Sequence, residues 1–321
     1  MVKSLLHQIR ERCAQVADRA RFVRIRGERI PEYSASLLME EAGPAELDPA
    51  YHYVGQGPAT LAFILTLDAV NFGSGYFPGL RKRRGLSGYF TVASSLNDYF
   101  CEFGPFSPDQ LAELSAENCS TLFGQERKNE TAFELMGLFA SALNDLGRLL
   151  IERFEGSFVR LVESAEQSAE KLVQILAAMP FYRDVQHYGD LEVPFYKRAQ
   201  LTAADLALAF GHEGPGRFED LDRLTIFADN LVPHVLRTDG LIEYDAHLSD
   251  RIARGELIAS GSLEEIEIRA SAVTVVERIR EEITRRGGSV TSMELDYRFW
   301  NRGQGASYKA RPRHRCRCVF Y

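Results

Sequence analysis

The residue of this sequence whose setting most clearly suggests chemistry is Asp229, a carboxylate inside the apolar segment TIFADNLVPHVLR (225–237). The apolar residues of the segment recur at helical spacing, which predicts a helix with one buried side. Pro233 is expected to break or kink this helix within a turn of Asp229. A carboxylate in such a place is costly unless it is used, so we expect Asp229 at the lip of a pocket. An N-cap or a solvated Asp beside Asn230 explains the segment equally well.

The elements that would position Asp229 form a helix, a hairpin and a second helix. A helix should end near Phe210, and a loop with three glycines should follow before the helix that carries Asp229. Further along the chain, the sequence Ser-Leu-Glu-Glu at 262–265 is a capping-box pattern that predicts the start of a long helix ending at Gly287. Residues 143–179 predict two consecutive helices with Gly156 between them.

Short strands are predicted in three places, where polar and apolar residues alternate: 88–93, 192–196 and 316–321. The expected fold class is therefore mostly α with a few short β-strands. No repeat, low-complexity tract or long linker marks a boundary. We expect one domain over residues 1–321, which can comprise two helical lobes with the active site between them.

Composition narrows the classes of function. With 321 residues, 45% of them hydrophobic, the chain can build a sizeable core, and its net charge of −7 opposes tight, sequence-independent binding to a nucleic-acid polymer. The first 25 residues predict a helix and no signal peptide, and no segment is long and apolar enough to span a membrane. Five scattered cysteines predict neither a disulfide framework nor a zinc site, so we expect a cytoplasmic protein without a metal.

Two resemblances follow from these segments. ADNLVPHV (228–235) after a glycine hairpin is loosely similar to the helix-hairpin-helix DNA glycosylases, which carry an Asp on the helix after the hairpin, although the hairpin here departs from their tight form. Seven segments in order closely resemble the queuosine salvage proteins, a family of queuosine 5'-phosphate N-glycosylases/hydrolases, over nearly the whole chain from about Tyr51. They are LDAVNF (67–72), SGYF (87–90), FYKRAQ (195–200), LTIFADNLVPHVL (224–236), EIEIRA (265–270), LDYRFW (295–300) and HRCRCVFY (314–321).

The resemblance implies a DNA-glycosylase-like helical architecture and hydrolysis of the N-glycosidic bond of queuosine 5'-monophosphate, which releases queuine and ribose 5-phosphate. Such cleavage passes through an oxocarbenium-like sugar that a carboxylate can stabilise or attack, and Asp229 is the candidate for that role. A 7-deazapurine lacks the ring nitrogen that purine hydrolases protonate. Hydrogen bonds to the guanine-like edge of the base should therefore matter for rate as well as for binding.

The resemblance also implies a set of substrate-binding residues. Asp296, Tyr297 and Asn301 are candidates for holding the base or its amine-bearing ring; where this chain has Asn301, the family often has an acidic residue. Phe227 can stack on the base or pack in the core. Asp296 can instead fix a backbone turn. The remaining candidates are cationic or titratable. His52 matches a ligand-contacting histidine of the family; the alternative is a histidine in a surface loop. Lys197 or Arg198 can hold the phosphate, or either can form an exposed ion pair.

Two other functions use the same residues. A DNA or RNA base-excision glycosylase would use the hairpin and Asp229, but the negative charge and the loose hairpin argue against it. A non-catalytic queuosine-binding protein would use Asp229 only to bind the amine of the ligand. For the enzyme we expect a small-molecule substrate, no cofactor, no membrane partner and a monomer.

Overall fold

The computed structural model describes residues 4–40, 43 and 45–321 of the chain. Its secondary structure is mostly α-helical with a few short strands, as the sequence predicts. The chain divides into two compact units. Unit 1 comprises the described residues of Met1–Ala45, Asp184–Lys197 and Asp222–Arg317, and unit 2 comprises Glu46–Arg183, Arg198–Leu221 and Cys318–Tyr321.

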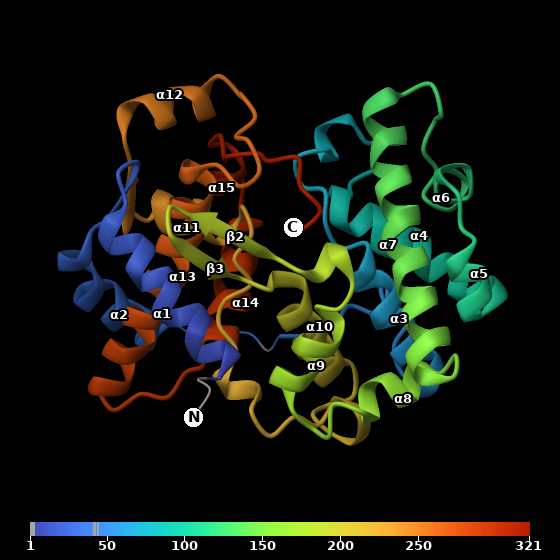
Figure 1. Ribbon diagram of the computed structural model, residues 1–321. Helices are drawn as coiled ribbons and strands as arrows, with labels where there is room; N and C mark the ends of the chain where they lie inside the picture. Colours follow the sequence, from blue (N-terminus) through green and yellow to red (C-terminus); the bar gives the residue numbers. More distant parts are fainter. Residues whose placement is uncertain (1–3, 41–42, 44) are drawn as a thin grey trace. The chain divides into compact units, whose positions relative to one another are not determined.

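Unit 1 holds the N-terminal helices, two small sheets and the C-terminal helices (Figure 1). Its elements are α1 (Leu5–Arg19), β1 (Val23–Ile25), α2 (Ile30–Met39), β2 (Val185–Tyr188), β3 (Leu191–Pro194), α11 (Val232–Thr238), β4 (Ile242–Tyr244), α12 (Ala246–Ala253), α13 (Leu263–Arg285), α14 (Ser292–Gly303) and α15 (Ala306–Lys309).

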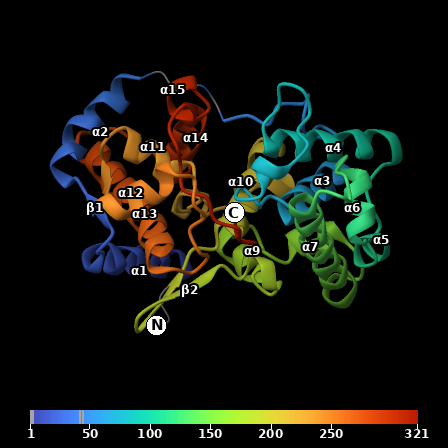
Figure 2. The ribbon, with the colours of Figure 1, turned by 90° about the horizontal axis from the view of Figure 1, so that it is seen from above.

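Helix α13 forms the centre of unit 1 and packs against α1, α2 and α11 (Figures 1 and 2). It begins where the sequence predicts, because the Ser262 side chain accepts a hydrogen bond from the Glu265 backbone N–H. Its buried face carries charged residues, which are costly in a core unless they are paired. Glu267 satisfies this condition by accepting hydrogen bonds from three backbone N–H groups, at Arg21, Phe22 and Val23. This helix therefore ties the N-terminal segment to the core through a buried carboxylate.

Both sheets of unit 1 have two antiparallel strands. In the first, β1 pairs with β4, so that Val23 lies opposite Tyr244. In the second, β2 and β3 form a hairpin in which Val185 lies opposite Pro194. The hairpin turns at Gly189, whose φ of +60° favours glycine. The predicted strand at 192–196 is therefore confirmed as far as Pro194.

Unit 2 consists of helices and connecting loops. Its helices are α3 (Pro58–Ala69), α4 (Gly88–Phe103), α5 (Pro108–Ala112), α6 (Ala116–Leu122), α7 (Glu130–Phe154), α8 (Phe158–Glu163), α9 (Ala169–Leu176) and α10 (Lys197–Ala209), the first residue of which belongs to unit 1. Helix α7, the long green helix in Figure 1, packs against α3, α5, α6 and α8. Helix α3 is buried continuously from Thr60 to Ala69, which explains why its sequence is apolar on all sides.

Several predicted elements are wrong. The break at Gly156 is confirmed, since α7 ends at Phe154 and α8 begins at Phe158, but the part after it holds two helices and not one, because Ser157 and Ser168 each cap a helix start. Residues 88–93 begin helix α4 and are not a strand, since the Ser87 side chain accepts from the Phe90 N–H. Residues 316–321 form no strand. Helix α10 ends near Phe210 as predicted, but the next α-helix begins only at Val232, so the helix-hairpin-helix is not reproduced.

None of the helices within the described residues combines the length and the hydrophobicity needed to cross a lipid bilayer.

Candidate functional site

The segment that carries Asp229 is not helical. It is irregular from Leu224 to Leu231, and α11 begins at Val232, so the predicted helix from residue 225 is wrong over its first half. Pro233 lies in the first turn of α11. Because proline has no N–H to donate and a φ suited to a helix start, it begins this helix instead of kinking it.

Asp229 is half-buried and anchored through one oxygen. Its Oδ1 accepts hydrogen bonds from the N–H groups of Leu231, at 2.7 Å, and Val232, at 3.1 Å. These contacts satisfy the N–H groups of the N-cap residue, Leu231, and of the first helical residue, Val232, so Asp229 supports the start of α11 without being its N-cap. Within the described parts of the chain, no hydrogen bond reaches Oδ2. The side chain therefore has a fixed direction and one carboxylate oxygen that can meet a ligand.

A second carboxyl group, that of Asp296 on α14, lies close to the same segment. Its Oδ1 accepts a hydrogen bond of 2.8 Å from the Phe227 N–H, so it holds the backbone of this irregular segment, which is not a turn at Phe227. Burial raises the pKa of Asp296 well above its usual range, and the charge of Asp229 raises it further. The Phe227 hydrogen bond and the positive charge of Lys197 act in the opposite direction. The pair thus consists of one half-exposed carboxylate and one buried carboxyl group that favours its protonated form.

The raised pKa of Asp296 predicts a dependence of stability on pH. The folded chain keeps the proton to a higher pH than the unfolded chain, in which the group titrates near 3.8. The free energy of unfolding should therefore fall as pH rises from about 4 through the folded pKa, by at most about 1.4 kcal/mol per pH unit. Asp296→Asn, which keeps an acceptor for the Phe227 N–H, should remove this dependence of the free energy of unfolding on pH. Urea unfolding of both proteins between pH 5 and 8 measures it, and parallel curves would disprove it.

The aromatic candidates lie together in unit 1. The rings of Phe227 and Tyr297 meet edge to face, with their centroids 6.1 Å apart. Phe227 is buried, whereas Tyr297 is half-buried. Asn301 lies one helical turn beyond Tyr297 on α14, and its side chain is exposed.

Two cations lie near the carboxyl groups. Lys197 begins α10, is buried, and donates its backbone N–H to Asp184 at 3.2 Å. The positive charge of the Lys197 ammonium group acts to lower the pKa of Asp296. Arg313 is exposed as a residue, but burial of its guanidinium group lowers the pKa of Arg313, and the charge of Asp229 acts in the opposite direction. The described structure thus brings Asp229, Phe227, Asp296, Tyr297 and Lys197 together in unit 1.

His52 belongs to unit 2 and is buried, so the interpretation of a surface loop histidine is wrong. Its Nδ1 lies 2.9 Å from the Asp48 carbonyl oxygen and its Nε2 lies 2.9 Å from the Tyr89 hydroxyl. A carbonyl only accepts, so Nδ1 donates and Nε2 of the neutral ring accepts. Burial lowers the pKa of His52, which favours this neutral form.

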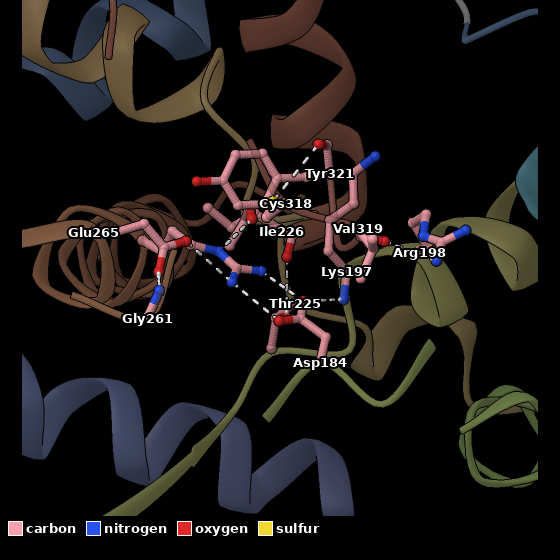
Figure 3. A network of polar contacts seen from close by, with 12 residues as sticks. Asp184, Lys197, Arg198, Thr225, Ile226, Gly261, Glu265, Cys318, Val319 and Tyr321 are labelled. Atoms are coloured by element: carbon pink, nitrogen blue, oxygen red, sulfur yellow. Dashed lines mark hydrogen bonds and ion pairs between the residues drawn. The ribbon is translucent and has the colours of Figure 1, made fainter. Parts of the chain in front are cut away.

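Arg198 has a structural role in unit 2. Its guanidinium donates to the backbone carbonyls of Asp68, Ala69, Phe181 and Val319 and lies over the rings of Phe72 and Tyr182 (Figure 3 labels Arg198 and Val319). The side chain is almost completely buried. An arginine used in this way is not an exposed ion-pair partner, and its donors are directed at the protein's own backbone.

Sequence reasoning missed a buried polar network next to Asp229. Arg269 on α13 donates from Nε to the Ala228 carbonyl at 2.9 Å and forms a bidentate ion pair with Asp184. Figure 3 shows Asp184 and Glu265, the two carboxylates of this network. A signal was present: Arg269 follows Ile266 by three residues and precedes Val273 by four, so a charge interrupts the apolar face of a predicted helix. Nothing in the sequence around Asp184 indicates that it forms the ion pair with Arg269.

No group of three or more His, Cys, Asp or Glu side chains within residues 4–40, 43 and 45–321 is arranged to hold a metal ion.

Comparison with known proteins agrees with the resemblance found in the sequence. Residues 51–321 match the family described as queuosine salvage protein. A protein of Sphaerobacter thermophilus, named queuosine 5'-phosphate N-glycosylase/hydrolase, is 34% identical over 312 residues, covering 96% of this chain and 95% of the relative. Relatives of the same name from Mus musculus and Dictyostelium discoideum are each 30% identical and each cover at least 97% of both chains. This chain therefore belongs to the queuosine salvage protein family.

Proposed function

We propose that this chain is an N-glycosidase that hydrolyses queuosine 5'-monophosphate to queuine and ribose 5-phosphate. The observation that carries the proposal is the similarity to relatives named queuosine 5'-phosphate N-glycosylase/hydrolase along nearly the whole length of both chains. The geometry around Asp229 supports it, because one carboxylate oxygen is anchored to two backbone N–H groups and the other is not.

Asp229 acts on the sugar in this proposal. As the bond between the anomeric carbon and the base nitrogen breaks, its electrons pass to the base and the sugar gains positive charge. The Oδ2 atom of Asp229 stabilises that charge or attacks the anomeric carbon. Water then supplies the hydroxyl group of ribose 5-phosphate, and its proton balances the departing base.

Asp296 and the two aromatic residues act on the base. A buried carboxyl group that keeps its proton can donate a hydrogen bond to the base, which an ionised carboxylate cannot do. The pKa shift of Asp296 supports this role. Phe227 and Tyr297 offer ring surfaces to the base, and Asn301 and His52 complete the proposed set of substrate-binding residues.

Lys197 binds the 5'-phosphate in this proposal, since it is a buried cation whose charge acts on Asp296. Lys197→Met should raise KM for queuosine 5'-monophosphate by about 10- to 100-fold, the size of a lost hydrogen bond to a charged group. KM for the free nucleoside should change little. Lys171→Met, which alters an exposed lysine paired with Glu166, is the control and should behave as wild type. Equal changes for both substrates would contradict the assignment.

We further propose that the enzyme acts on free nucleotides as a cytoplasmic monomer. The net charge of −7 supports a small substrate over a nucleic-acid polymer. All five cysteines are free thiols, which suits a reducing compartment.

Release of free base tests the proposed function. The wild-type chain is incubated with queuosine 5'-monophosphate, queuosine, GMP and a uracil-containing DNA duplex. Queuine should appear from the monophosphate, and neither guanine nor uracil should appear. Release of uracil from the duplex would favour a DNA glycosylase, and tight binding of the monophosphate without release would identify a binding protein.

A further inference from the structure

The carbonyl group directly before Asp229 is held by a charged side chain that is remote in sequence. The Nε–H of Arg269 donates to the Ala228 oxygen at 2.9 Å. The peptide that contains this carbonyl also contains the backbone nitrogen of Asp229, so its orientation sets the direction from which the Asp229 side chain departs. Two other contacts fix the neighbouring groups: the Phe227 N–H donates to Asp296, and Oδ1 of Asp229 accepts from the Leu231 and Val232 N–H groups.

The guanidinium group of Arg269 is itself held from several sides. Its Nη1 and Nη2 donate to Oδ1 and Oδ2 of Asp184 at 3.0 and 2.5 Å, and Nη1 lies 3.4 Å from Oε1 of Glu265. The Phe195 ring lies against it, with its centroid 4.0 Å from the central carbon. Glu265 is oriented in turn by accepting the Gly261 N–H (Figure 3). Such a planar group, bonded bidentately on one edge and stacked on one face, has very little freedom to turn.

Stability alone does not account for this arrangement. Arg269, Asp184 and Glu265 are at most 2% exposed, so their charges are fully desolvated. A buried ion pair of this kind often contributes no more to stability than well-packed hydrophobic residues of the same volume. Such a pair does fix the orientation of its groups. Here the fixed guanidinium of Arg269 donates to the peptide group that joins Ala228 to the candidate catalytic residue, Asp229.

We infer that Arg269 is a positioning residue, which directs the Asp229 carboxylate by fixing the Ala228 carbonyl and is itself fixed by Asp184. The inference rests on the proposed function, because the readout of correct positioning is hydrolysis. A carboxylate displaced by about 1 Å from its productive place can lose about 100-fold in rate while the substrate still binds.

The test compares three variants of the full-length chain. Arg269→Lys keeps a positive charge for Asp184, but an ammonium cannot also provide the planar Nε–H to Ala228. Asp184→Asn releases the guanidinium from its bidentate partner and leaves Glu265 as the counter-charge. Arg10→Lys is the matched control. Arg10 also pairs with a carboxylate, that of Glu277, and also donates to a carbonyl of the irregular segment. That carbonyl belongs to Leu224, which is farther from Asp229 in the chain than Ala228 is.

For Arg269→Lys, kcat for free-base release from queuosine 5'-monophosphate, per folded molecule, should fall about 10- to 100-fold, with KM within about threefold of wild type. Asp184→Asn should shift kcat in the same direction, and Arg10→Lys should retain wild-type kcat. Wild-type kcat in folded Arg269→Lys, or an equal loss in Arg10→Lys, would overturn the inference. If Arg269→Lys does not fold, wild-type kcat in Asp184→Asn overturns it.

Amide hydrogen exchange separates this inference from the proposed function. The amides of Leu231 and Val232 donate hydrogen bonds to Oδ1 of Asp229. They should exchange faster in Arg269→Lys than in wild type and remain unchanged in Arg10→Lys. Faster exchange in Arg269→Lys, together with a wild type that releases no base, would support the positioning contact and refute the proposed function. Unchanged exchange and unchanged kcat would refute the positioning role while the hydrolase activity stands.

Discussion

Asp229→Asn is expected to lower the rate of queuine release from queuosine 5'-monophosphate by about three orders of magnitude, with substrate affinity within a few-fold of wild type. The amide keeps an oxygen that can accept from the Leu231 and Val232 N–H groups, so the start of α11 should be preserved. It lacks the negative charge that stabilises or attacks an oxocarbenium-like sugar. Steady-state kinetics and equilibrium binding measure the two quantities separately.

Asp245→Asn is the matched control for this substitution. Asp245 caps α12 in unit 1 by accepting from the Leu248 N–H at 2.7 Å, so the change removes the same charge from another helix start. Asn caps helices about as well as Asp, and the rate should therefore stay at the wild-type value. A similar loss in both variants would mean that the rate depends on folding of the helix starts and not on the chemistry of Asp229.

Arg198→Met is expected to have the largest effect on stability, lowering the free energy of unfolding by about 3–5 kcal/mol. The guanidinium donates to four buried or half-buried backbone carbonyls, at residues 68, 69, 181 and 319, and methionine can satisfy none of them. Chemical denaturation measures the difference.

Arg160→Met provides the comparison in the same unit, since Arg160 forms an ion pair with Glu155 in which both side chains are largely exposed. Exposed pairs contribute about 0–1 kcal/mol, so this variant should unfold almost as the wild type does. An equally small loss for Arg198→Met would show that water or other donors replace the guanidinium at the four carbonyls.

The parts of the fold that local signals determine were predictable. The capping pattern at Ser262 and the apolar spacing after it located α13, and the alternation at 192–196 located most of β3. Local signals gave a wrong prediction where the same residues are compatible with both a strand and a helix. The aromatic and β-branched residues of 88–93 suit a strand, but Ser87 is an N-cap that starts α4.

The C-terminal segment shows why the rest could not be predicted. Its backbone groups find partners that are remote in sequence: the Val319 carbonyl accepts from Arg198, and the Tyr321 carbonyl accepts from the Gly73 N–H. These contacts replace the strand ladder that the alternation of 316–321 suggested. No pattern within the segment encodes them.

For the candidate site too, one part could be predicted from the sequence and another part could not. Asp229 was singled out as a carboxylate in an apolar segment, and both Asp229 and Asp296 were singled out because their segments resemble the family. The geometry that directs Asp229 depends on Arg269 and Asp184, which are far from it in sequence. Only the folded chain brings these groups together, so the sequence could indicate the candidate catalytic residue but not the groups that hold it.

A single-turnover measurement tests whether Asp229 acts on the sugar during hydrolysis. Wild type and Asp229→Asn, each in excess over queuosine 5'-monophosphate, are followed for free queuine and ribose 5-phosphate, and binding of the nucleotide is measured in parallel. We predict that wild type forms the two products in equal amounts, while Asp229→Asn binds the nucleotide and forms almost none. Product formation by Asp229→Asn at the wild-type rate would contradict this prediction.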